Sequence, residues 1–85
     1  MSLLDKIEEL REGYSEVFYR NKKYGLNKTV FNGGSSYKIY AEELAGNDFI
    51  SLNFYITSKD HLLKPCEMPK EKVIDFLMNC SPVKG

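Results

Sequence analysis

Cys66 is the residue whose type and surroundings come nearest to catalytic chemistry. It lies between Pro65 and Pro69, just ahead of a segment with helical periodicity. A thiol in this place could act as a nucleophile, because a helix N-terminus and nearby cations such as Lys64 stabilise a thiolate. The alternative is structural, since a free cysteine often serves as a small buried apolar side chain.

A nucleophilic Cys66 would need a base, and His61 is the single histidine of the chain. On an extended segment the two residues are roughly 16 Å apart and point to opposite faces of a strand. No third residue that could orient the histidine is recognisable. We therefore favour the structural interpretation of Cys66, and a thiol-dependent enzyme ranks third among the functions considered.

Cys80 is the other cysteine, and neither a disulfide nor a metal site is expected from the pair. A helix of about eleven residues separates it from Cys66 by about 16 Å, whereas the Cα atoms of a disulfide lie within about 7 Å. With His61 the cysteines form no C-x-x-C or H-x-x-x-H spacing. The sequence predicts no metal and no cofactor, and two cysteines fit a reducing compartment.

The segment FNGGSSYK contains two glycines that could let backbone N–H groups approach a phosphate. Phosphate loops lead into a helix, however, and this segment lies between two strand patterns. Gly33 and Gly34 are therefore predicted to adopt positive φ in a hairpin turn.

The elements that must position these residues follow from hydrophobic periodicity. A helix is predicted from Ser2 to about Glu12, with Ser2 as N-cap and Asp5 completing a capping box. The pattern then changes to a period of two, with turn residues at regular intervals, as in an antiparallel meander. The predicted strands are Tyr14–Arg20, Tyr24–Phe31, Tyr37–Leu44, Asp48–Thr57 and, as a short fifth strand, His61–Lys64.

A second helix is predicted from Pro69 to about Cys80. Its inward stripe would consist of Val73, Ile74, Leu77 and Cys80, with Phe76 at the margin. The fold class is therefore α+β, with an N-terminal helix, a meander sheet of four to five strands and a C-terminal helix. Residues 1–80 form one domain, and residues 81–85 are expected to fray.

The clearest strand alternates between an apolar and a polar face, and its apolar set is Ile50, Leu52, Phe54 and Ile56. Both helices are expected to pack on this face. The opposite face would then carry a mixture of aromatic, amide and cationic side chains. Its candidate binding residues are Lys38, Tyr40, Ser51, Asn53 and Tyr55, joined by Lys28 if the second strand has the matching register.

Charge is distributed unevenly although the net charge is zero. Residues 13–40 carry +4 and residues 41–60 carry −3. The basic candidates are Arg20, Lys22, Lys23 and Lys28, in the predicted first hairpin. Pairing with the following acidic segment would cancel much of their field.

These features favour a small soluble binding module over an enzyme, because no catalytic constellation can be assembled. The expected partner is another protein or a second copy, bound through an exposed sheet face or edge. The alternative is weak binding of RNA or single-stranded DNA through the basic hairpin and the tyrosines. No signal peptide or membrane span is recognisable, so a cytoplasmic location without membrane association is expected.

Overall fold

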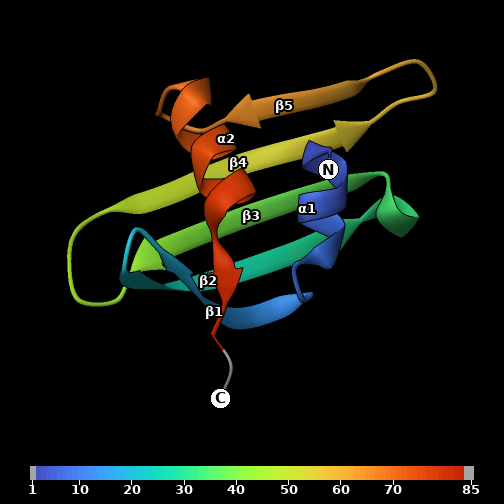
Figure 1. Ribbon diagram of the computed structural model, residues 1–85. Coiled ribbons are helices and arrows are strands. Elements are labelled where there is room, and N and C mark those ends of the chain that lie inside the picture. Colours follow the sequence, from blue (N-terminus) through green and yellow to red (C-terminus); the bar gives the residue numbers. More distant parts are fainter. Residues whose placement is uncertain (1, 84–85) are drawn as a thin grey trace.

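The computed structural model describes residues 2–83 and shows two helices packed on one face of an antiparallel sheet (Figure 1). The spatial order of the strands is β5-β4-β3-β2-β1-β6. In chain order the elements are α1 (Leu3–Glu9), β1 (Gly13–Tyr19), β2 (Lys22–Phe31), the 3₁₀ turn η1 (Asn32–Gly34), β3 (Ser36–Glu43), β4 (Phe49–Ile56), β5 (His61–Pro65), α2 (Lys70–Asn79) and β6 (Ser81–Pro82). The predicted α+β class and helix order are confirmed, with six strands instead of four to five.

Helix α1 begins at the predicted capping box. The Ser2 Oγ accepts a hydrogen bond of 3.1 Å from the Asp5 backbone N–H, and the Asp5 carboxylate accepts one of 3.2 Å from the Ser2 N–H. These bonds satisfy backbone donors that a helix N-terminus otherwise leaves free. The bond from the Ser2 backbone, followed by that with its side chain, lowers the pKa of Asp5.

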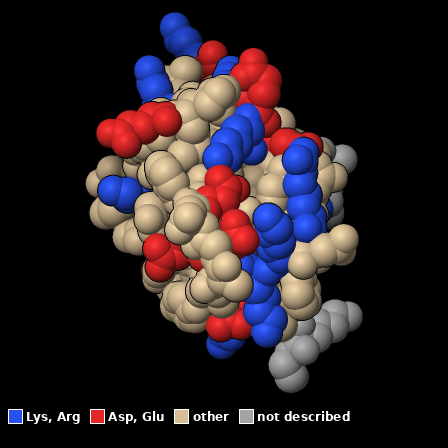
Figure 2. All heavy atoms as spheres, turned by 90° about the vertical axis from the view of Figure 1, so that its left-hand side faces the viewer, with Lys and Arg blue, Asp and Glu red and all other residues tan. Residues whose placement is uncertain are grey.

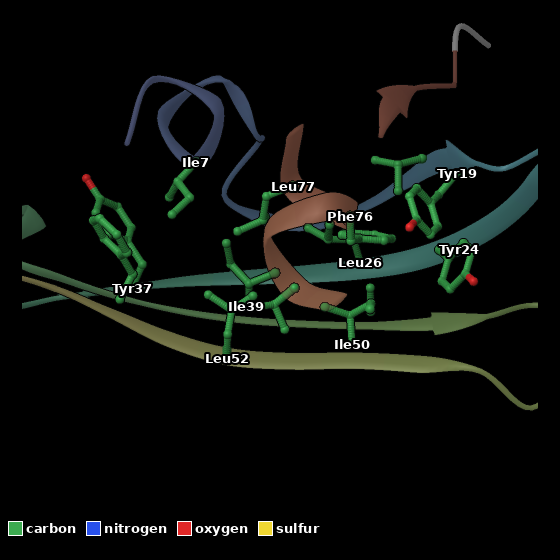
Figure 3. Packing of buried hydrophobic residues seen from close by; sticks show 14 residues of the cluster. Ile7, Tyr19, Tyr24, Leu26, Tyr37, Ile39, Ile50, Leu52, Phe76 and Leu77 are labelled. Atoms are coloured by element: carbon green, nitrogen blue, oxygen red, sulfur yellow. The ribbon is translucent and has the colours of Figure 1, made fainter. Parts of the chain in front are cut away.

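The hydrophobic core lies between the sheet and the two helices (Figure 3). Alternation along β3 and β4 places Ile39, Leu52 and their neighbours on the helix side, because successive strand residues point to opposite faces. Ile7 from α1 and Leu77 from α2 meet this layer from above. The predicted apolar face of the fourth strand is thus the helix-covered face.

Phe76 is fully buried, so its predicted place at the margin of the last helix is wrong. Its ring centroid lies 5.0 Å from that of Tyr19 and 5.3 Å from that of Tyr24. Ile74, predicted to point inward, is only half-buried. The buried stripe is Val73, Phe76 and Leu77, an i, i+3, i+4 set, and it faces the sheet where the rings of Tyr19 and Tyr24 lie.

The expectation that the chain frays from residue 81 is also wrong for residues 81–83. Ser81 and Pro82 form β6 beside Phe18 and Val17, and the Val83 N–H donates to the Glu16 carbonyl at 3.0 Å. The edge of β1 leaves backbone groups unpaired, and this short strand satisfies some of them. Residues 84 and 85 of the predicted tail lie outside the described residues.

Two turns place the strands in register. Gly33 and Gly34 adopt φ of 66° and 101° between β2 and β3, as predicted for a hairpin turn. Arg20 and Asn21 have φ of 52° and 64° at the turn between β1 and β2. Two successive positive φ values are typical of a type I′ turn, whose twist matches that of the flanking strands.

Candidate functional site: the uncovered face of the sheet

The face of the sheet opposite α1 and α2 carries no helix within residues 2–83 (Figures 1 and 3). We call it the uncovered face. Strand register sets its side chains in rows that run across the strands. One row joins Thr29, Lys38, Asn53 and Lys64, and the next contains Tyr14, Asn27, Tyr40 and Ser51.

The register confirms the predicted placement of the central candidates. Lys38 is the direct partner of Asn53, and Tyr40 is the direct partner of Ser51. Tyr55 lies one row away, opposite Ser36. These candidates share one face as the alternation of β3 and β4 predicted.

The uncovered face also holds every large hydrophobic side chain that is exposed in the described part of the chain. Each of these eight residues is more than a third exposed. They are Tyr14, Phe18, Phe31, Tyr40, Leu44, Phe49, Tyr55 and Leu62. Single exposed apolar residues are ordinary on protein surfaces, but these eight residues are concentrated on one face, which makes that face the candidate site.

Six of these eight residues were not among the candidates from the sequence. The alternation could have located Phe49, because it lies two residues before Ser51 on the same strand. The positions of the Tyr14 and Leu44 side chains depend instead on a packing detail at Gly25. A Cβ atom at Gly25 would lie 2.8 Å from the Tyr14 hydroxyl and 3.1 Å from a Leu44 methyl, so glycine lets both side chains lie over β2.

Lys28 is the one candidate whose predicted location on the uncovered face is wrong. It points to the helix side and is only 6% exposed. Its Nζ donates to the carbonyl oxygens of Ile7 at 2.7 Å and Leu10 at 2.8 Å, and lies 5.1 Å from the Tyr37 ring centroid. Lys28 therefore satisfies carbonyls that the end of α1 leaves free, and burial lowers its pKa.

The other basic candidates of the first hairpin are engaged with acids. Arg20 pairs with Asp75 at 2.9 Å, Lys22 with Glu43 at 3.7 Å, and Lys23 with Glu16 at 3.9 Å. Of these three acids only Glu43 lies in the acidic segment 41–60 that was expected to compensate the basic hairpin. Only Lys23 of the three basic residues shares the uncovered face with Lys38 and Lys64.

Cys66 lies at the edge of the uncovered face, beyond the end of β5. Its N–H donates to the Ser51 carbonyl at 2.9 Å, and its Sγ lies 3.6 Å from the Asn53 Nδ2. The His61 ring lies on the other side of the sheet, 5.7 Å from the Phe54 ring centroid. Thiol and imidazole therefore occupy opposite faces, as predicted, and both cysteines are free.

A second feature is an open hollow of about 640 Å³ where the β1–β2 turn and the β3–β4 loop meet α2. Figure 2 shows this end of the molecule, with carboxylates lying among Lys and Arg side chains. The Tyr24 hydroxyl donates to Asp48 at 2.8 Å, and the Lys72 Nζ lies 2.6 Å from the same carboxylate. Apart from Glu71, the charged and hydroxyl groups that line the hollow thus already have partners.

The charges in this hollow hold one another in their ionised forms. The bond from Lys72, followed by that from Tyr24, lowers the pKa of Asp48 despite partial burial. Burial and the bond to Asp48 raise the pKa of Tyr24. Tyr19 likewise donates to Asp75, and that bond, followed by the one from Arg20, lowers the pKa of Asp75. This network joins the strand loops to α2.

Comparisons with known proteins give no functional assignment. The sequence matches no protein-family model, and neither the curated proteins nor the solved structures yield a significant match. Among residues 2–83 no group of three or more His, Cys, Asp or Glu side chains could hold a metal ion. In the same part of the chain no helix has the length and apolar character needed to cross a membrane.

Proposed function

We propose that this chain is a small interaction module that binds protein surfaces through the uncovered face. The observation that carries the proposal is the position of the eight exposed large hydrophobic residues, all on this one face. Hydration of such a cluster is unfavourable, and association with a complementary surface removes it from water.

The size of the face suits a specific contact. Five strands about 4.8 Å apart and about eight residues of about 3.4 Å each give a rectangle of about 24 Å by 27 Å. Covering it would bury about 650 Å² on each partner, near the lower end of standard interfaces. The free thiols of Cys66 and Cys80 support the cytoplasmic location expected from the sequence.

An affinity capture experiment with matched variants tests this proposal. Three proteins are immobilised: the wild-type chain, the face variant Phe49→Lys and the control variant Glu9→Lys. The proteins that each of them captures are then quantified. Phe49 lies on the uncovered face, whereas Glu9 is exposed on α1 on the opposite side. Proteins that bind wild type and control but not Phe49→Lys support the proposal. An identical set on all three contradicts it.

A second candidate function is weak binding of single-stranded nucleic acid. It is favoured by the row that joins Lys38, Asn53 and Lys64, which lies between Tyr40 and Tyr55. Bases could stack on the tyrosines while lysines meet phosphates. The acids Glu16 and Glu42 on the same face weaken this candidate. A titration with a labelled oligonucleotide at low salt that gives no binding would exclude it.

A further inference from the structure

We propose that the partner of the uncovered face is a second copy of this chain, stacked face to face with its β3 antiparallel to β3 of the first. The two-fold axis would lie between the sheets, run across the strands and pass beside Tyr40. This inference rests on the proposed function and adds the identity of the partner and the orientation in which it binds.

The charge pattern of β3 is the first support. Lys38, Tyr40 and Glu42 alternate along the uncovered face, all three are exposed, and neither charge has an ion-pair partner among the described residues. Lys38 and Glu42 lie at equal distances on either side of Tyr40, about 7 Å each way. The strand therefore presents opposite charges placed symmetrically about an aromatic centre.

This symmetry distinguishes between two ways of stacking the sheets. An axis parallel to β3 would place each Lys38 opposite the second copy's own Lys38, and like charges there are repulsive. An axis across the strands places Lys38 of each copy opposite Glu42 of the other. The second arrangement makes two opposite-charge pairs in one isologous interface, which is an interface formed by the same surface patch of both copies.

Sheet geometry allows these pairs to form. Stacked sheets lie about 10 Å apart with strand directions about 30° from alignment. A rotation of about 30° about Tyr40 displaces residues 7 Å away by only about 3.5 Å, which is within the reach of lysine and glutamate side chains. The pairs therefore survive the twist that real sheets have.

The apolar residues fit the same orientation. Ser36 has Phe31 and Tyr55 as direct neighbours across the strands, so it forms a low point between two rings. Leu44 lies at the opposite end of β3 and is exposed. Reversing β3 brings Leu44 of one copy above Ser36 of the other, between those rings. Apolar contacts would supply affinity while the charge pairs set the orientation.

Charge exchange between positions 38 and 42 gives a direct test. Lys38→Glu leaves two acids on the uncovered face of β3, and Glu42→Lys leaves two bases there, so each variant alone should dimerise at least tenfold more weakly than wild type. An equimolar mixture of the two should form a one-to-one heterodimer, and the double variant Lys38→Glu/Glu42→Lys should regain wild-type self-association. Sedimentation equilibrium over a wide concentration range measures the association of wild type, the two single variants, their mixture and the double variant.

A control separates local pairing from net charge. Lys59→Glu and Glu9→Lys make the same changes in net charge at exposed positions away from the uncovered face. Their mixture should associate no more tightly than either variant alone. Thermal unfolding of every variant checks that each is folded. Positions 38 and 42 are both exposed in the sheet, so substitutions there should leave the fold intact.

Each outcome of these association measurements either supports or overturns the proposed dimer. The inference is supported if each single variant dimerises weakly, the equimolar mixture forms a heterodimer and the double variant regains wild-type self-association. A wild-type chain that remains monomeric at about 1 mM, or one whose dimer is insensitive to positions 38 and 42, overturns it. A monomeric chain that still captures other proteins in a Phe49-dependent way would overturn the second copy as partner while leaving the proposed function standing.

Discussion

The ammonium group of Lys28 on β2 lies 2.7 Å from the carbonyl oxygen of Ile7 in α1, and it holds the end of that helix to the sheet. We expect Lys28→Met, which keeps an unbranched apolar side chain but removes the ammonium group, to lower the free energy of unfolding by about 1–3 kcal/mol, because two carbonyl groups lose their donor. Urea denaturation measures the loss.

Lys59→Met is the matched control for this change. Lys59 is exposed in the turn between β4 and β5, and its substitution should alter stability by less than about 0.5 kcal/mol. Equal effects of the two substitutions would show that the bonds to α1 contribute nothing.

The pairing of Asp48 with Lys72 and Tyr24 predicts a pH-dependent contribution to stability. The pKa of Asp48 is lowered from its ordinary value of 3.8, so the contribution is present above that pH and is lost as the pH falls through the folded-state pKa. Because the group is partly exposed, we expect Asp48→Asn to cost only about 1 kcal/mol at pH 7. The difference from wild type should shrink toward zero at pH 2.

Denaturant midpoints of both proteins at pH 7, 4 and 2 provide the measurement. Glu71→Gln serves as the control, because Glu71 is exposed at the start of α2 and forms no ion pair among the described residues. A constant difference between wild type and Asp48→Asn at all three values would refute a stabilising carboxylate at position 48.

The two cysteines should differ in their rates of alkylation. Burial raises the pKa of the Cys80 thiol, so less of it is ionised at neutral pH, and only the thiolate reacts. Cys66 lies at the edge of the uncovered face instead. We expect iodoacetamide to label Cys66 faster than Cys80 in the folded chain, with both rates equalised in denaturant. Peptide mass spectrometry resolves the two sites, and faster labelling of Cys80 would contradict the described environments.

Replacement by serine at the two phenylalanines of β4 should have different effects on stability and association. Phe54 is 2% exposed in the core, and Phe54→Ser should cost at least about 3 kcal/mol. Phe49 is 37% exposed on the other face, and Phe49→Ser should cost less than about 1 kcal/mol while weakening association. Urea denaturation and sedimentation of both variants test this, and a large loss of stability at position 49 would indicate a structural role for that face.

The alternation of β4 and β3 was enough to predict which residues share each face. Strand geometry forces successive side chains to opposite sides, so Tyr40, Asn53 and Tyr55 were located from their spacing alone. The same reasoning extends to Phe49, which the sequence analysis did not use. What alternation cannot supply is the pairing between strands, which brought Lys38 beside Asn53.

Lys28 and Phe76 show where sequence reasoning failed. A lysine within a strand is ordinarily assigned to solvent, and the bonds that compensate its burial come from α1, 18 and 21 residues away in the chain. Phe76 was misplaced because helical periodicity alone does not fix how a helix is rotated over the sheet. The packing of Tyr19 and Tyr24 against it decides that rotation.

Hydroxyl-radical footprinting across concentration tests the face-to-face association most directly. Oxidation of Tyr40, Phe49 and Tyr55 should fall as the chain is raised from micromolar to millimolar concentration, in parallel with its mean mass. Oxidation of Met78 on α2, away from the uncovered face, should stay constant and serves as the internal reference. Unchanged oxidation of the three aromatic residues while the mean mass rises, or a mass that never rises, would contradict association through the uncovered face.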